Sequence, residues 1–451
     1  MSFLRRPRRL FGRWGLLGLV AGLAVGSTLG AVASSRPAKL PAPRFLVLHP
    51  SRALVRAGTP VRLIAGVLCR PSGSPGCGII SATAHVTTPR GTSRSVPGAR
   101  AEGGYRFTVP AELVPDEGFS YWLEFTTATG ASLAYPPSAS ANPLRVRTTA
   151  GLPITEVAPF SWRDLADPDA TVVFLPYGSE PGQVGRTAGG PDRDPLGPSS
   201  FAVGSDGSID VVDWVNDRIE VFSRNGRLTR TLPTPVHRTL DLAIGIDGSL
   251  DLLTLGDEGV DYRVSASDGR VLGSFPVTMG VARRVEPGTA GPSVLVGPGQ
   301  WLPAGSTDGS ATASAQEARV IASAPTDGSG ISGDLAEGEL AVAWTRPDGA
   351  DAGAVLRLPP GVRVGSDYFV RPLADGGALV ARGLWDDTHF VVGVFRVDAR
   401  GGLVRLSLLP EPSTEQDARL STVRWSAPDA VLVAYARTNG VAIESFKVVE
   451  A

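Results

Sequence analysis

The chain has 451 residues, a length that suits two or three domains. Its charged fraction of 19% is low for a cytosolic enzyme, and the formal net charge of −1 comes with no basic cluster beyond the N-terminus, which argues against nucleic-acid binding. The 55 glycines and 38 prolines are spread along the chain, a distribution typical of short strands joined by tight turns.

Residues 1–33 have the layout of an export segment. A basic stretch from Arg5 to Arg13 precedes an uncharged run rich in Leu, Val, Ala and Gly, which ends in an A-x-A cleavage site at residues 31–33. The stretch 8–13 (RRLFGR) also resembles the twin-arginine export motif, although Gly12 replaces its usual Leu. We therefore expect an export signal and no cytoplasmic location for the rest of the chain.

The same segment has a second interpretation, an uncleaved membrane anchor. Its apolar run is just long enough to cross a bilayer core of about 30 Å, and the arginines would hold its start in the cytoplasm. The protein is then either secreted or attached to the outer face of the cytoplasmic membrane. Contact with the membrane is expected only through this segment, and only if it stays uncleaved.

Residues 34–43 (SSRPAKLPAP) show no periodicity and predict a linker, and residues 44–150 alternate between strand and turn patterns. Short strands in this number predict an immunoglobulin-like sandwich. The stretches 105–114 and 119–125 resemble bacterial immunoglobulin-like or fibronectin-like accessory domains, in which a Y-x-x-x-V-P strand faces a Y-W strand. The expected strands are 45–48, 61–69, 80–87, 105–109, 119–127, 132–135 and 144–147.

Cys69 and Cys77 are the only cysteines, and seven residues separate them. In an oxidising compartment a lone, close pair predicts a disulfide. A metal site would need further ligands, and no histidine lies near them in the sequence. We therefore expect a disulfide that closes a small loop in the sandwich.

Residues 151–451 carry turn dipeptides at a spacing near forty residues. Such dipeptides favour tight hairpins, and a period of about 40–45 residues with four strands each is typical of propeller blades. The pattern predicts a six-bladed β-propeller, in which residues 170–175 supply the missing strand of the last blade and close the ring. The marks are 225–226, 268–269, 308–309, 348–349, 400–401 and 439–440.

The best-defined blade covers residues 201–232. It has an Asp-Gly turn, then the pattern V-x-D-x-x-N-x-R-I-x-V-F, which places Asp213, Asn216 and Arg218 in one motif. This blade resembles the NHL repeat. Residues 178–185 resemble the glycine-containing segment that leads into that repeat. The likeness weakens from residue 240 onward.

One face of a propeller receives the turns between the second and third strands together with the connections between blades; we call it the loop face. Its predicted residues are rich in acids and include aromatic and histidine side chains, and they form our candidate binding face. They are Asp213, Trp214, Asn216, Asp217, His237, Asp257, Glu258, Asp261, Trp385, Asp386, Asp387 and His389.

Two interpretations of this face stay open. Carboxylate and amide oxygens could hold a calcium ion, and NHL-like propellers that hydrolyse esters or lactones use such a metal. Alternatively, Asp213, Asn216 and Arg218 are turn and inter-strand partners of the repeat itself, and the other acids are solvated. No G-x-S-x-G or H-E-x-x-H motif occurs, so we predict no catalytic residues.

The sequence therefore predicts an exported binding or scaffold protein without a cofactor, whose propeller face recognises a protein or glycan partner at the cell envelope. The alternative is a calcium-dependent extracellular hydrolase or lyase built on the same propeller. A pure scaffold role for the propeller is a third possibility.

Overall fold

The computed structural model describes residues 44–49, 54–70, 78–102, 104–136, 143–189, 196–234, 237, 239–245, 247–254, 260–264, 266–276, 284–286, 292–297, 300–303, 331–336, 338–411, 423–426 and 430–448. Apart from one short 3₁₀ helix, η1 (Ala111–Leu113), the elements of this part of the chain are strands. No helix of the described residues is long and apolar enough to cross a membrane. The predicted export segment, the linker and Cys77 lie outside the described residues.

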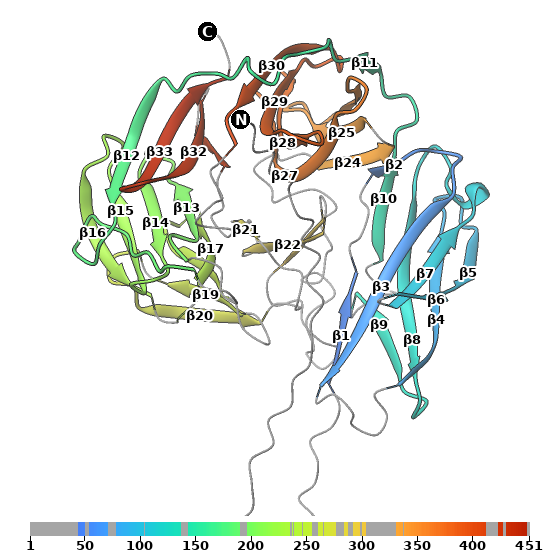
Figure 1. The fold of residues 1–451 in the computed structure, drawn as a ribbon. Coiled ribbons are helices and arrows are strands. Elements are labelled where there is room, and N and C mark those ends of the chain that lie inside the picture. The colour runs from blue at the N-terminus through green and yellow to red at the C-terminus, as the bar shows by residue number, and fades with distance from the viewer. Residues whose placement is uncertain are drawn as a thin grey trace, which may run out of the picture. The chain divides into compact units, whose positions relative to one another are not determined.

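The first ten strands form two sheets that enclose one hydrophobic core (Figure 1). One sheet has the order β1-β3-β7-β6, and the other has the order β2-β10-β8-β4-β5 with β9 added beside β8. All seven strands predicted for this region are present, and β2, β5 and β6 are additional. Their bounds are β1 Arg44–Leu48, β2 Leu54–Val55, β3 Val61–Arg70, β4 Ile79–Thr87, β5 Ser93–Pro97, β6 Ala99–Ala101, β7 Gly104–Val109, β8 Phe119–Thr127, β9 Ser132–Tyr135 and β10 Leu144–Thr148.

The core of this sandwich follows from alternation along its strands. In β8, every second side chain from Phe119 to Thr127 is buried, and the intervening ones are half-buried. Phe107, Tyr121 and Phe125 fill the space between the sheets. Cys69, near the end of β3, is disulfide-bonded.

Six further sheets follow among the described residues, the number that the turn spacing predicts, and we number them as blades 1 to 6. The predicted turn at 308–309 lies outside the described residues. Blades 1, 2 and 5 each consist of four consecutive antiparallel strands, and blade 3 has three strands among the described residues. The strands are β13 Ser200–Val203, β14 Ile209–Asp213, β15 Arg218–Phe222 and β16 Leu228–Pro233 in blade 1; β17 Thr239–Ile244, β18 Leu250–Thr254, β19 Val260–Val264 and β20 Val271–Pro276 in blade 2; β21 Arg284–Glu286, β22 Ser293–Gly297 and β23 Gln300–Pro303 in blade 3; and β27 Arg363–Pro372, β28 Ala378–Trp385, β29 Phe390–Val397 and β30 Leu403–Leu409 in blade 5.

Blades 4 and 6 each take their outermost strand from the segment before blade 1. In blade 6, β12 (Ala170–Pro176) pairs with β33 in antiparallel fashion, which confirms the predicted closing strand. In blade 4, β11 (Ile154–Glu156) pairs with β26 in parallel fashion, and the residue pattern did not predict this strand. The other strands are β24 Ile331–Ala336, β25 Glu339–Thr345 and β26 Asp351–Arg357 in blade 4, and β31 Val423–Ser426, β32 Ala430–Arg437 and β33 Gly440–Lys447 in blade 6.

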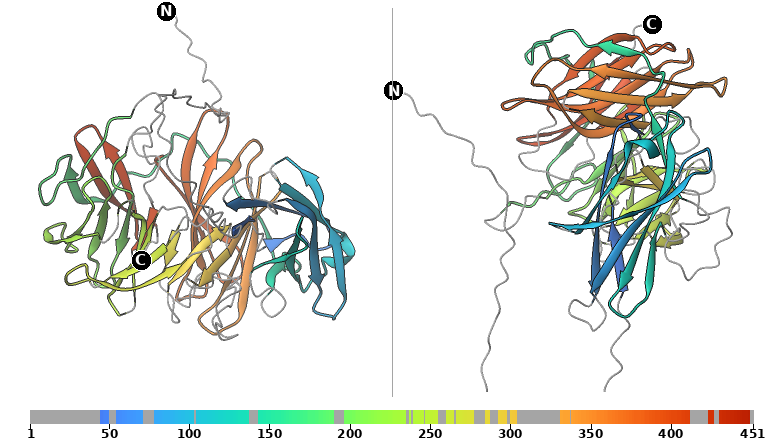
Figure 2. Two further views of the ribbon diagram at one scale, coloured as in Figure 1. Left: turned by 90° about the horizontal axis from the view of Figure 1, so that it is seen from below. Right: turned by 90° about the vertical axis from the view of Figure 1, so that its right-hand side faces the viewer.

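The blades are arranged as a propeller (Figures 1 and 2). The first strands of neighbouring blades contact one another, namely β13 with β17, β17 with β21, β27 with β31 and β31 with β13. Between β11 and β12 the chain also touches blade 5, because Leu165 forms a parallel bridge to Leu408 of β30. One segment thus binds the outer edges of blades 4, 5 and 6 in turn.

Candidate functional site

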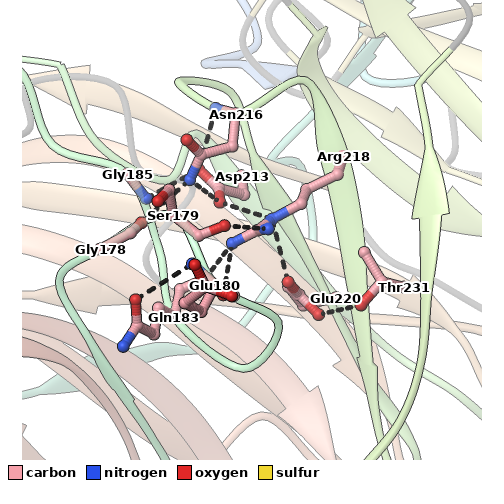
Figure 3. Close-up of polar contacts among 10 residues, drawn as sticks. All are labelled: Gly178, Ser179, Glu180, Gln183, Gly185, Asp213, Asn216, Arg218, Glu220 and Thr231. Carbon is pink, nitrogen blue, oxygen red and sulfur yellow. Dashed lines mark hydrogen bonds and ion pairs between the residues drawn. The ribbon is translucent and has the colours of Figure 1, made fainter.

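Asp213, the last residue of β14, is fully buried at the centre of a polar network (Figure 3). Its Oδ1 accepts hydrogen bonds from the backbone N–H groups of Gly185 (3.0 Å) and Asn216 (3.3 Å). Its Oδ2 accepts from Asn216 Nδ2 (2.7 Å) and Arg218 Nε (3.1 Å). A carboxylate has about four lone-pair positions, so these contacts occupy all the acceptor capacity of Asp213.

Arg218, the first residue of β15, joins this carboxylate to the segment that leads into blade 1. Its guanidinium donates to the carbonyl oxygens of Ser179 (2.6 Å), Glu180 (2.8 Å) and Gln183 (2.8 Å). Its Nε also lies 2.9 Å from Oε1 of the buried Glu220. The planar, multi-donor guanidinium suits such a site, in which carboxylates and carbonyl oxygens surround one cation.

The lead-in segment approaches blade 1 closely because it has glycine where contact is tightest. A Cβ at Gly185 would lie 2.5 Å from Val215 Cβ, so a larger residue would push the segment away. Asn216 Nδ2 also donates to the carbonyl of Gly178 (3.0 Å). Asp213, Asn216 and Arg218 therefore act as turn and inter-strand partners. This is the second of the two interpretations given above for the motif.

Of the remaining residues predicted for the binding face in blades 1 and 2, the structure places Asp217 and His237 in contact. Asp217 adopts a left-handed backbone conformation (φ 51°), and its Oδ2 lies 2.7 Å from Nδ1 of the exposed His237. Trp214 is half-buried in the same turn. Asp257 and Glu258 lie outside the described residues, and Asp261 lies in β19 with its side chain outside them as well.

A second cluster surrounds the β28–β29 turn of blade 5. Asp386 accepts the backbone N–H groups of Thr388 (2.6 Å) and His389 (2.7 Å), and its Oδ2 lies 3.1 Å from His389 Nδ1. The hydrogen bond from the Thr388 N–H, with those from His389, holds the pKa of the Asp386 carboxyl well below its usual range. Asp386 is therefore ionised at neutral pH.

Two aromatic rings contact side chains of this turn. The Trp162 ring stacks against the His389 imidazole at 5.6 Å between centroids and 8° between planes. The Arg363 guanidinium lies 4.5 Å from the centre of the Trp385 ring and donates to Asp387 Oδ1 (2.8 Å). Trp162 and Arg363 were not predicted as site residues, because neither lies near the turn in sequence. The turn therefore exposes an aromatic and charged surface.

At the inner strands of blades 6, 1 and 2, three polar side chains are paired with one another. Asp241 of β17 is fully buried and forms an ion pair with Arg424 of β31. Ser200 donates to the same carboxylate, and Arg424 Nε donates to the Phe201 carbonyl (2.7 Å). Across the described residues, no group of three or more His, Cys, Asp or Glu side chains is placed to hold a metal ion.

Comparison with known proteins does not assign the chain to a family. No family model matches the chain, and no curated protein matches it. Solved structures that resemble it include hydrazine synthase from Kuenenia stuttgartiensis (10% identity, 52% of this chain and 73% of that chain, TM-score 0.34). They also include BamB from Moraxella catarrhalis (11%, 57% and 85%, 0.26) and virginiamycin B lyase from Staphylococcus aureus (10%, 90% and 99%, 0.21). These values carry no argument about function, and the propeller assignment follows from the sheets of this chain itself.

Proposed function

We propose that this chain is an exported, non-enzymatic binding or scaffold protein whose propeller recognises a protein or glycan partner at the cell envelope. The observation that carries the proposal is the β28–β29 turn, where Trp385 and His389 stay exposed while carrying ordered contacts to Arg363 and Trp162. Aromatic and arginine side chains held in place in this way are the residues that most often dominate binding energy.

The proposal narrows the candidate binding face. Asp213, Asn216 and Arg218 are occupied by internal contacts and are not offered as ligand-binding groups. Blade 5 contributes Trp385, Asp387 and His389, and blade 1 contributes the exposed pair Asp217 and His237. The calcium-dependent alternative is weakened, because Asp213 has no acceptor capacity left to coordinate a cation.

The test uses a photo-crosslinking residue placed at the exposed Thr388 in the β28–β29 turn or, as a matched control, at the exposed Arg400 in the β29–β30 turn of the same blade. In intact cells, position 388 should capture a discrete envelope protein or glycan that position 400 does not capture. A Trp385→Ala variant should weaken that capture. Equal capture at both positions, or none at 388, would refute recognition by this turn.

Two further measurements separate the alternatives. Elemental analysis with thermal melting in chelator tests the metal-dependent enzyme: about one tightly held calcium per chain, with melting lowered by chelation, would support it. Mass analysis of the N-terminus of the exported protein tests whether the chain is exported and whether residues 1–33 are cleaved. A start at Ser34 means cleavage, an intact start means an anchor, and protein confined to the cytoplasm contradicts export.

A further inference from the structure

The outer face of the sheet that contains β4 and β8 is rich in hydroxyl groups. Along β4 and β8 the inward residues are buried, and the intervening ones are exposed or half-buried. The register places Ser95, His85 and Trp122 in one row across β5, β4 and β8, and it places Thr83 opposite Glu124 in the next. We call this surface the hydroxyl face; its members are Thr83, His85, Thr87, Ser93, Ser95, Ser120, Trp122, Glu124, Thr126 and Ser132.

The centre of the hydroxyl face is an ordered stack and hydrogen-bond chain. The imidazole of His85 lies against the indole of Trp122, with 3.9 Å between centroids and 15° between planes. His85 Nε2 lies 2.9 Å from Glu124 Oε2, and Ser95 Oγ lies 3.2 Å from His85 Nδ1. Ser132 donates to Glu124 Oε1 at 2.7 Å. Four strands thus hold these side chains in fixed relative positions.

The charge state of this cluster is also defined. The hydrogen bond from Ser132, with that from His85, lowers the pKa of Glu124, so the carboxylate is ionised at neutral pH. An ionised carboxylate only accepts hydrogen bonds, whereas each serine or threonine hydroxyl both donates and accepts. The hydroxyl face therefore offers many neutral partners, one strong acceptor and one partly exposed aromatic ring.

We propose that the hydroxyl face binds a neutral saccharide. A pyranose has an apolar C–H face, which suits an aromatic ring, and a rim of hydroxyl groups that both donate and accept. The half-buried indole of Trp122 is covered by His85 on one face, and its remaining exposed part supplies the aromatic surface. Glu124 supplies the acceptor, and the serine and threonine side chains supply neutral hydrogen bonds. Because the side chains are already ordered, a ligand would not have to fix them on binding.

The same features disfavour other occupants. Protein interfaces bury an apolar centre, and the rows on either side of Trp122 are mostly polar instead. One row holds Ser93, Thr87, Ser120 and Arg145, and the other holds Pro97, Thr83, Glu124 and Ala134. A peptide cannot add to β4 or β8 as an extra strand, because each is paired on both sides. An anionic polymer would need a basic cluster, whereas the stack is flanked by the carboxylate of Glu124 and a single arginine, Arg145, lies opposite Ser120 at the margin of the face.

The test measures binding of purified full-length protein to a panel of neutral hexasaccharides, such as cello-, malto-, xylo- and mannohexaose, by calorimetry and ligand-observed NMR. At least one member should bind. Trp122→Ala should weaken that binding by roughly tenfold or more, the loss expected when a ring contact is removed. Trp122→Phe should retain part of it, and Glu124→Gln should weaken it without disturbing the core.

Two substitutions outside the hydroxyl face serve as controls. Arg106→Ala, on the exposed side of β7 in the opposite sheet, should leave saccharide binding unchanged. Trp385→Ala should also leave it unchanged, which separates this surface from the propeller turn. If no hexasaccharide binds the wild type, or if Trp122→Ala and Glu124→Gln bind as well as the wild type, the proposal is wrong while the propeller proposal stands.

Discussion

Arg424 of β31 and Asp241 of β17 form a buried ion pair that links blade 6 to blade 2 across the first strand of blade 1. Arg424 Nε also donates to the carbonyl of Phe201 in blade 1 (2.7 Å). Asp241 Oδ2 accepts a hydrogen bond from the backbone N–H of Val285 in blade 3 (2.8 Å). One pair of charges therefore connects the inner strands of four consecutive blades around the point where the chain closes its ring.

Removing one member of this pair should be costly. Asp241→Ala would leave Arg424 buried without a counter-charge, and we expect it to lower the free energy of unfolding by about 3–5 kcal/mol, measured by urea denaturation. Asp241→Leu combined with Arg424→Met should recover most of that loss, because no charge stays buried. Arg90→Ala, which breaks an exposed ion pair with Glu117, is the control and should change little. A single variant as stable as the wild type would contradict this role.

The closing strand β12 can be tested at Gly440. A Cβ at this position would lie 2.3 Å from the Leu175 carbonyl oxygen, so Gly440→Ala must push β12 away from β33. We expect faster hydrogen exchange of the β12 amides and a loss of about 1–3 kcal/mol of stability, as in other overpacked sites.

Gly78→Ala is the matched control, because a Cβ there would lie 3.5 Å from Ala128 Cβ, an ordinary contact, and neither glycine has a positive φ. Unchanged exchange of β12 in Gly440→Ala would mean that the strand does not depend on this close approach.

Elements with strong local patterns were predictable from the sequence. β8 was predicted with its observed bounds because the alternate positions 119, 121, 123 and 125 are all aromatic or aliphatic. The closing strand was predicted because Thr171–Leu175 is a β-branched and apolar run. β11 was missed because it has only three residues and no alternation, and its partner β26 follows far along the chain.

The site was predictable only in part, for a related reason. The residue pattern pointed to Asp213, Asn216 and Arg218 together, but it could not decide between a cation site and a structural network. That choice depends on backbone carbonyls such as that of Ser179, which any residue type could supply. The stack of Trp162 on His389 likewise depends on where the chain passes between β11 and β12.

His49 makes the sandwich sensitive to acid. Its Nδ1–H donates to the Ile64 carbonyl (2.6 Å), and in the neutral ring its Nε2 accepts from the Tyr121 hydroxyl (2.7 Å). Burial lowers its pKa from 6.5 to about 4. Because the unfolded chain binds the proton more readily, stability is fully present above about pH 6.5 and is lost as the pH falls to about 4, a change of about 3 kcal/mol.

Hydrogen exchange of β8 amides at several pH values would follow this loss in the sandwich itself. His49→Gln, which keeps a donor for Ile64 but does not titrate, should remove most of the pH dependence. If the variant keeps the wild-type dependence, His49 is not its source.

Asp210 of β14 should produce the opposite dependence in blade 1. The side chain is buried beside Ala202 and Val221, and its Oδ1 has no hydrogen-bond partner among the described residues. Burial raises its pKa from 3.8 to about 6, against the opposing effect of Arg230. Its contribution to stability is thus fully present below about pH 3.8 and is lost as the pH rises through about 6, again by about 3 kcal/mol.

Asp210→Asn should therefore stabilise blade 1 at pH 7 and leave it nearly unchanged at pH 4, as followed by exchange of β14 amides. His49 and Asp210 have opposite signs within the same pH window, so each is followed by exchange of the amides of its own sheet, β8 for His49 and β14 for Asp210. An Asp210→Asn protein that matches the wild type at both pH values would show that water or a rearranged Arg230 already compensates the buried carboxyl.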